Sequence, residues 1–409
     1  MGDRAPDVGG DPQGVLDRLR GPVGVLAGVW LMAAVASAIQ IMPASVLTLV
    51  MDDFGIGPST ASWLVSVPFL LQLVVSIPIG YALDRVDNRL VLLAGTLVLV
   101  LANLGSWWGA VHGRFDVILG SRFLLGAGIA IVWTGGANLS GMAFTGRHRA
   151  TAMGVFTTSA PFGYMVAQIV APFFANWWSW EAGFLVLAGG SVLAFVAFVA
   201  VASEHGHGDV ETDRPARGDL RAVLTHRNVW LVSLASFAAY SLNLFFNSWM
   251  PTYLAREFEL TLTQAGPMTA LFPAMGVVAR ATGGALSDRL FGGARRPVPL
   301  ASFLVTAPVV VAIALLETPL LMAALLIVSG YTVQLGIGLF YTYVRELVPE
   351  SVGGTAVSIL SATSFLGAFS APVVAGGLID LTGVYLHAFG YALGLSVLGI
   401  ALMLVAPEP

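Results

Sequence analysis

The amino-acid sequence predicts an all-α membrane protein with twelve transmembrane helices in two pseudo-symmetric halves of six. Of the 409 residues, 57% are hydrophobic and only 10% are charged, and the mean hydropathy is +0.84. Soluble domains carry about 25% charged residues, so a soluble fold could not bury this much apolar surface. A regular series of apolar segments and a repeat between the two halves of the chain support the same fold class.

Apolar segments of about 20 residues recur along the chain, and each is long enough to cross a hydrocarbon core of roughly 30 Å. We expect twelve spans, near residues 23–50, 60–83, 90–111, 116–140, 150–175, 182–202, 228–252, 262–287, 298–316, 319–344, 353–379 and 384–405. The first residues are polar and lack the apolar core of a signal peptide, so we expect the first span to be an ordinary one. The predicted organisation is a cytoplasmic tail (1–20), a first half (21–202), a cytoplasmic linker (203–226) and a second half (227–409).

The arginines predict the orientation of these spans. All 19 basic residues are arginine. With the N-terminus in the cytoplasm, fifteen of them lie on the cytoplasmic side, Arg114 and Arg256 lie outside, and Arg122 and Arg280 lie in the membrane. Cytoplasmic loops are enriched in basic residues. We therefore expect a multi-pass protein of the cell (inner) membrane with both termini in the cytoplasm.

Several kinds of function find no support in the sequence. The chain has no cysteine, which excludes disulfides and thiolate metal sites. His205 and His207 lie in the acidic linker, where solvated histidines are expected rather than a metal site. No phosphate-binding loop is present, so ATP does not drive the protein directly. We expect no cofactor, no metal, no nucleic acid and no enzyme active site, and we expect a monomer.

The two halves repeat each other at an offset of 204 residues. The stretch GYALDRVDNR (80–89) ends the second span, and GALSDRLFGGARR (284–296) ends the eighth. At the same offset, RATAMG (149–154) opens the fifth span and GGTAVS (353–358) opens the eleventh. Parallel halves of six spans are typical of transporters, whose binding site lies near the midplane between the halves.

These loops resemble the hallmark loop of the major facilitator superfamily, which reads roughly Gly-x-Leu-Ala-Asp-Arg-x-Gly-Arg-Arg/Lys. The matching residues are Gly80, Asp84, Arg85 and Arg89 in the first half and Gly284, Asp288 and Arg289 in the second, while Asp87 replaces the second glycine. The span-four stretch LGSRFLLGAGIA (119–130) is similar to another motif of the superfamily. The resemblance implies two halves that rock around a central site.

The charged loop residues have a physical role in such a movement. An aspartate at the cytoplasmic end of span two can face the N-terminus of span eleven, where unpaired N–H groups carry partial positive charge. By symmetry, Asp288 is expected to face the N-terminus of span five. The matching residues are therefore expected to act as a conformational switch, and the alternative is that they are only interfacial anchors.

Arg280 is the first candidate for substrate binding. It lies eight residues before Asp288, roughly 12 Å along the helix axis, so its charge cannot easily reach the surface. Intramembrane charges usually line a solute path. The stretch from Arg280 to Arg289 resembles the span-eight signature of nitrate/nitrite porters, in which arginines of spans two and eight hold the anion. At the repeat position in span two this chain has Ser76, and the asparagine–glycine signatures of that group are not evident.

Arg122 in span four is the second embedded cation. In organic-anion members of the superfamily an arginine here contacts the substrate, whereas in drug/proton antiporters it serves proton coupling; the remaining alternative is that Arg122 only bonds backbone carbonyls. The middle third of every predicted span lacks Asp, Glu and Lys. A pore with fixed positive and no fixed negative charge favours an anion, held by guanidinium groups. The neutral candidates that would complete the site are Gln40, Tyr164, Gln168, Tyr240, Asn243 and Gln334, with Trp133 and Tyr341 as weaker ones.

The sequence thus predicts a secondary transporter of a small anion, an inorganic oxyanion or a small carboxylate. Exchange of anions and protonation of the substrate both remain open as coupling mechanisms. One alternative keeps the fold but makes both arginines structural, in a proton-coupled transporter of a drug or neutral solute. A sensor or membrane enzyme is the other, and the short linker and the lack of a catalytic set argue against it.

Overall fold

The computed structural model describes residues 21–83, 85–201, 223–316 and 318–409, and most of these residues lie in helices. The N-terminal tail and most of the linker expected from the sequence lie outside the described residues. The helices, in chain order, are α2 (Pro22–Ser45), α3 (Leu47–Phe54), α4 (Pro58–Leu83), α5 (Asn88–Val111), α6 (Phe115–Ala143), α7 (Arg147–Thr157), α8 (Ser159–Trp177), α9 (Ala182–Val201), α11 (Arg227–Glu257), α12 (Leu262–Leu290), α13 (Pro297–Leu315), α14 (Pro319–Glu346), the 3₁₀ turn η1 (Glu350–Val352), α15 (Gly353–Thr382) and α16 (Leu386–Val405).

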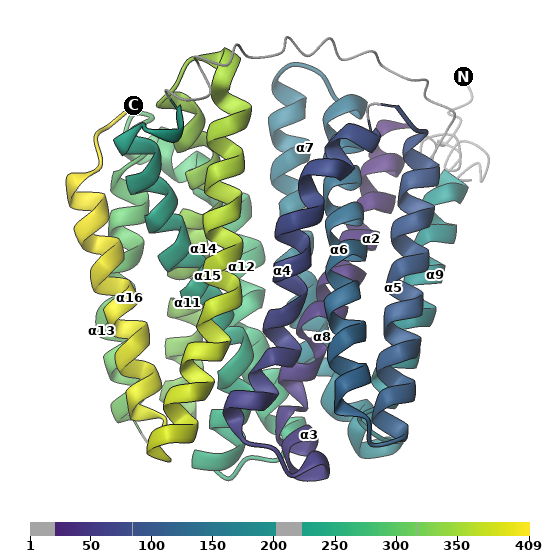
Figure 1. Ribbon diagram of the computed structural model, residues 1–409. Coiled ribbons are helices and arrows are strands. Elements are labelled where there is room, and N and C mark those ends of the chain that lie inside the picture. The colour runs from purple at the N-terminus through teal and green to yellow at the C-terminus, as the bar shows by residue number, and fades with distance from the viewer. Residues whose placement is uncertain (1–20, 84, 202–222, 317) are drawn as a thin grey trace, which may run out of the picture.

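The helices form two bundles that stand side by side, with α2 to α9 in one half and α11 to α16 in the other (Figure 1). Helix α3 lies at one end of the molecule, which we call the α3 end (Figure 1). Helix α9 ends and α11 begins at the opposite end, which we call the linker end. The predicted division into two six-span halves is therefore present in the fold.

The described helices include ten that are long and apolar enough to cross a membrane. The other two spans are α12, which carries Arg280, Asp288 and Arg289 in its second part, and the pair α7–α8, which is divided at Thr158. Span one is also divided, at Val46, and its helix continues to Phe54, beyond the predicted end. The chain turns there through Gly55, whose φ of 61° lies in the left-handed region that glycine adopts without strain.

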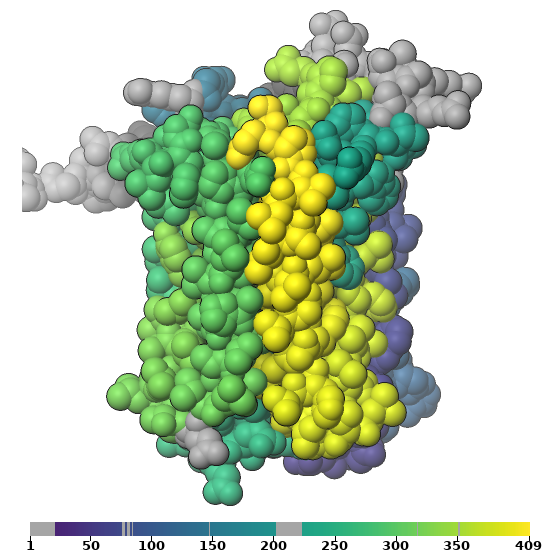
Figure 2. All heavy atoms as spheres, turned by 90° about the vertical axis from the view of Figure 1, so that its left-hand side faces the viewer, coloured from purple at the N-terminus to yellow at the C-terminus, as the bar shows by residue number. Residues whose placement is uncertain are grey.

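Large apolar side chains cover the outward faces of both bundles. Leu193, Leu320 and Leu381, for example, are 71%, 82% and 86% exposed. Figure 2 shows α16 running along the height of the second half on its outside, and Leu398 and Leu404 of this helix are also exposed. Such a surface is unfavourable in water but natural in hydrocarbon. The protein is an integral membrane protein.

The internal repeat is visible in the packing of glycines against backbone. A Cβ added at Gly126 in α6 would overlap the carbonyl oxygen of Pro68 in α4. In the second half, a Cβ at Gly330 in α14 would overlap the carbonyl oxygen of Phe272 in α12. Both residues of the second pair follow those of the first by 204 positions. The same offset that links the loop motifs therefore also links two helix crossings.

A second pair of crossings is related in nearly the same way, with glycines 204 residues apart and partner carbonyls 203 residues apart. A Cβ at Gly163 in α8 would overlap the carbonyl oxygen of Ala34 in α2, and a Cβ at Gly367 in α15 would overlap that of Phe237 in α11. These crossings bring backbones together more closely than any larger residue allows, as small residues commonly do in membrane bundles.

Substitution of these crossing glycines should destabilise the protein. Gly163→Ala and Gly367→Ala each place a methyl group against a backbone oxygen that cannot move away alone, and we expect a loss of about 1–3 kcal/mol for each. Gly189→Ala in α9 is the matched control, since a Cβ there meets no atom within 4 Å. Thermal unfolding of the detergent-purified variants should show a lower midpoint for the first two only. Equal midpoints for all three would contradict the close packing.

Candidate substrate site between the two halves

The two halves touch at the α3 end through two symmetry-related contacts. A Cβ at Gly266 in α12 would overlap the carbonyl oxygen of Gln168 in α8 and lie 2.8 Å from the Pro172 ring. A Cβ at Gly376 in α15 would lie 3.1 Å from the Cβ of Ser62 in α4. Gly266 follows Ser62, and Gly376 follows Pro172, by 204 residues. At the α3 end, therefore, glycines allow helices of the two halves to pack closely against each other and close this end.

Gln168 joins the halves at the same end by hydrogen bonds. Its Nε2 donates to the backbone carbonyl of Asn247 in α11 at 2.8 Å, and its Oε1 accepts from the Ser45 hydroxyl at 2.8 Å. The Asn247 carbonyl lacks a helical partner because residue 251, four positions later, is Pro251, which has no N–H. Both polar atoms of Gln168 are thus engaged, and its predicted contact with substrate stays a prediction.

Arg280 lies between the halves and not toward lipid. Its Nε donates to Oε1 of Gln334 in α14 at 3.1 Å, and its Nη1 donates to the backbone carbonyl of Thr157 in α7 at 3.0 Å. The Thr157 carbonyl is again four residues before a proline, Pro161, so it has no helical donor. One guanidinium therefore connects α12 to its neighbour α14 and to the opposite half.

The charge of Arg280 has no acidic partner among the residues that the structure describes, where each ion pair found involves another arginine. Its two hydrogen-bond acceptors are uncharged. Gln334 reaches it because residue 276 is glycine: a Cβ at Gly276 would overlap the Gln334 amide. The phenols of Tyr164 and Tyr240 lie close enough to Arg280 to interact electrostatically with its guanidinium group. The interface thus holds one uncompensated positive charge surrounded by neutral polar groups.

Each half contributes a hydrogen-bonded pair of these polar groups. The Tyr164 hydroxyl donates to Oε1 of Gln40 at 3.2 Å, and the hydroxyls of Tyr240 and Tyr341 lie 3.3 Å apart. Nε2 of Gln40 and Nε2 of Gln334 are buried and have no hydrogen-bond partner among the described atoms. We call this set the central cluster; it consists of Gln40, Tyr164, Tyr240, Arg280, Gln334 and Tyr341.

Arg122 lies apart from the central cluster, inside the first half. The side chain is 1% exposed, and its Nε and Nη1 donate to the carbonyls of Leu64 at 2.9 Å and Ile39 at 2.7 Å. Both carbonyls lie four residues before a proline, Pro68 and Pro43 respectively. The third nitrogen, Nη2, donates to the adjacent Gln40 carbonyl. Arg122 therefore fastens α6 to α2 and α4, and its predicted substrate contact stays a prediction.

Asn243 and the weaker candidate Trp133 also lie outside the central cluster. Asn243 accepts a hydrogen bond from Asn247 at 3.1 Å within α11. Trp133 packs edge-on against Phe156, with ring centroids 5.1 Å apart. Both positions are therefore used for packing in this structure.

The predicted switch residues lie at the linker end. Asp288 pairs with Arg295 at 2.9 Å, and Arg295 also pairs with Glu346 at 2.9 Å. These carboxylates hold the pKa of Arg295 above its ordinary value. Arg289 and Gly284 are exposed. In this structure the Asp288 carboxylate is thus bound within its own half.

The switch residues of the first half are only partly visible. Asp84 lies outside the described residues, and Gly80 belongs to the last turn of α4. Arg85 lies in the turn before α5, and Arg89 lies in the first turn of α5. Asp87, the departure from the hallmark loop, is the N-cap of α5 and accepts a hydrogen bond from the Arg89 N–H at 2.8 Å. The capping rule could have predicted this role from sequence.

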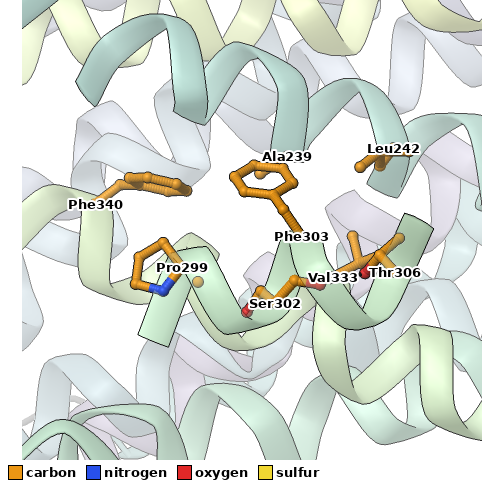
Figure 3. Close-up of a pocket in the computed structure, with 9 residues that line it drawn as sticks. Ala239, Leu242, Pro299, Ser302, Phe303, Thr306, Val333 and Phe340 are labelled. Atoms are coloured by element: carbon orange, nitrogen blue, oxygen red, sulfur yellow. Dashed lines mark hydrogen bonds between the residues drawn. The ribbon is translucent and has the colours of Figure 1, made fainter. Parts of the chain in front are cut away.

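A separate cavity lies within the second half, between α11, α13 and α14 (Figure 3). Its volume of about 10 Å³ suits at most one water molecule. Phe303 and Phe340 point into it, and Ser302 and Thr306 are its polar lining residues (Figure 3). None of the predicted substrate-binding residues lines it, so the central cluster remains the candidate site.

Comparisons with known proteins agree with this arrangement. The family model described as the Major Facilitator Superfamily matches residues 29–293 and 246–409. A bacterial homologue of the human lysosomal transporter Spinster, solved in an inward-facing and occupied conformation, superposes with a TM-score of 0.76 and 16% sequence identity, over 94% of this chain and 96% of that chain.

Relatives of similar length are also found by sequence. A "Probable nitrate/nitrite transporter" of Mycobacterium tuberculosis is 26% identical over 80% of this chain and 82% of its own length. The "Nitrite extrusion protein" of Bacillus subtilis is 25% identical over 86% of each chain. The "Hexuronate transporter" of the same organism is 25% identical over 78% of each chain.

Loss of Arg122 should destabilise the first half, and the size of this effect should depend on the prolines that free the carbonyls it binds. Arg122→Met leaves proline-freed carbonyls without donors in an apolar interior, and we expect a cost of about 3 kcal/mol or more. In a Pro68→Ala background the Leu64 carbonyl regains a helical donor, so the same substitution should cost less. Thermal unfolding of the four proteins in this cycle measures the difference. An Arg122→Met effect independent of Pro68 would exclude this account.

Proposed function

Because the chain belongs to the Major Facilitator Superfamily, it is a membrane transporter, and we propose that it carries a small anion, an inorganic oxyanion or a small carboxylate. The observation that carries this proposal is the position of Arg280, between the halves and bonded only to uncharged acceptors. A fixed positive charge of this kind is balanced when an anion enters. The donors around it complete a site that attracts negative solutes.

The chemistry of the central cluster supports this substrate class. A planar guanidinium binds carboxylates and oxyanions through two parallel N–H groups. The phenols of Tyr164 and Tyr240 add hydroxyl donors, and the Gln40 amide contributes a buried N–H without a partner. The substrates in the names of three relatives, nitrate/nitrite, nitrite and hexuronate, are all anions. One arginine with neutral donors suits an anion of single charge.

Transport is proposed to follow from rocking of the two halves about this cluster. The halves touch at the α3 end, while Asp288 at the linker end is bound by Arg295 of its own half. Helices α7 and α15 both begin without a side-chain cap. In the opposite state, Asp84 and Asp288 are proposed to meet these helix N-termini and close the linker end. The protein is proposed to work as a monomer, since one chain holds both halves.

The linker end is proposed to face the cytoplasm of the cell membrane. Arg289, Arg295, Arg296 and Arg345 gather there, as expected for cytoplasmic loops. The coupling is proposed to be exchange of one anion for another, because the central cluster contains an arginine, two amides and three tyrosines but no carboxylate that could carry a proton.

A second candidate function is transport of a neutral solute or drug with structural arginines. The observation that favours it is Arg122, whose three nitrogens all donate to backbone carbonyls. Arg280 decides between the two candidates, because of the two embedded arginines it is the one that lies between the halves.

Arg280→Ala should reduce anion flux about tenfold or more, because the charge that attracts the substrate is lost. Flux is measured in proteoliposomes with nitrate, nitrite, formate and small carboxylates as test solutes. Arg227→Ala is the matched control, since it removes the same charge from an exposed position at the start of α11. Unchanged anion flux in Arg280→Ala, or transport of a neutral solute by both proteins, would favour the second candidate.

Binding can be tested without transport. A transported anion should raise the thermal unfolding midpoint of the purified protein, by about 2.7 kcal/mol in stability at one hundred times its dissociation constant. Arg280→Ala should abolish this shift, whereas Arg227→Ala should retain it. A shift of equal size in Arg280→Ala would place the anion elsewhere.

A further inference from the structure

The break between α7 and α8 leaves the backbone oxygen of Thr157 without a donor from its own helix. Helix α7 ends at Thr157, and regular bonding resumes where the Phe162 N–H donates to the Thr158 carbonyl at 3.1 Å. The Thr157 carbonyl would need the N–H of residue 161, which is Pro161. In the apolar interior such an oxygen is costly without a donor. Arg280 from the other half supplies that donor at 3.0 Å.

This contact uses part of the surface that an anion needs. A guanidinium binds an oxyanion bidentately along one of two edges, Nη1 with Nη2 or Nε with Nη2. In Arg280, Nη1 of the first edge already donates to the Thr157 carbonyl, and Nε of the second edge already donates to Gln334. Gln334 lies in the same half as Arg280 and moves with it. The Thr157 carbonyl belongs to the opposite half, and its oxygen would also repel an anion placed beside it.

We propose that the Thr157 carbonyl is an internal competitor of the anion for Arg280, so that anion binding breaks the contact between α7 and α12. This inference rests on the proposed function and adds a coupling between occupancy and movement. In this structure the hydrogen bond between the Thr157 carbonyl and Arg280 ties the halves together beside the site. When an anion takes the Nη1–Nη2 edge, the tie is lost and α7 is free to move relative to α12. Pro161 is then a positioning residue, because it keeps the carbonyl free of its own helix.

Substitution of Pro161 tests the competition. In Pro161→Ala the new N–H can bond the Thr157 carbonyl within the helix, so Arg280 loses its internal partner. Anion affinity should then rise on the order of tenfold, because binding no longer breaks a hydrogen bond to a charged group. The readout is the dissociation constant for nitrate and for formate in the detergent-purified protein. Pro308→Ala is the matched control, since it restores an N–H in α13, within the second half and away from Arg280.

A distance measurement tests the tie independently of affinity. The chain has no cysteine, so spin labels can be attached through Ala150→Cys in α7 and Ala281→Cys in α12, both exposed positions. The interlabel distance should lengthen when saturating nitrate is added to the otherwise unchanged protein. Pro161→Ala and Arg280→Met should each lengthen it without any anion, and agreement between them separates loss of the tie from straightening of the helix.

The outcomes distinguish this inference from the proposed function. Unchanged affinity together with an unchanged distance in Pro161→Ala overturns the competition while leaving anion transport intact. If none of the test anions binds or crosses the membrane, the proposed function fails and the competition fails with it. A distance that lengthens in Pro161→Ala and Arg280→Met would then still establish the tie. Tighter binding and a lengthened distance in Pro161→Ala, with neither in Pro308→Ala, support the competition.

Discussion

A backbone carbonyl inside a membrane must find a donor, and the structure is organised around the places where its own helix cannot provide one. Each internal proline removes the N–H that would serve the carbonyl four residues earlier. At four of these positions a side chain from another helix donates to the freed oxygen, and these side chains belong to the residues that the sequence singles out as embedded polar groups. The carbonyls in question are those of Ile39, Leu64, Thr157 and Asn247, bound by Arg122, Arg280 and Gln168. Side chains that suggest a solute path therefore also hold the scaffold together.

The location of each contact decides what it can do. Arg122 binds carbonyls of its own half, so the contact is fixed while the halves move against each other and serves the rigidity of the first bundle. Gln168 and Arg280 bind carbonyls of the opposite half, so their contacts depend on how the halves are placed. The same kind of hydrogen bond is thus permanent at Arg122. At Gln168 and Arg280, it would have to break and form again when the halves rock. The close glycine contacts at the α3 end belong to the second group.

Much of the fold could be predicted from sequence because hydrophobicity and the 204-residue repeat are strong signals. The repeat also appears in features that no loop motif reveals, such as Gly126 and Gly330 at equivalent crossings. The divisions at Val46 and Thr158 were missed, since apolar segments give no sign of a local break. For the site, the embedded position of Arg280 followed from the sequence, but the partners of Arg122 did not. The spacing of prolines was a usable signal for those partners, and Thr157, which carries no charge, could be found only through it.

The neutrality of the partners of Arg280 has an electrical consequence. Neither the Thr157 carbonyl nor Gln334 carries a charge that offsets the guanidinium. A transporter loaded with a monovalent anion therefore moves one unit less positive charge through the membrane field than the same transporter when it returns empty. Membrane potential acts at about 2.3 kcal/mol per elementary charge per 100 mV, so it would act most strongly on the empty return. Carriage in one direction would generate current, whereas one-for-one swapping of monovalent anions would be electrically silent.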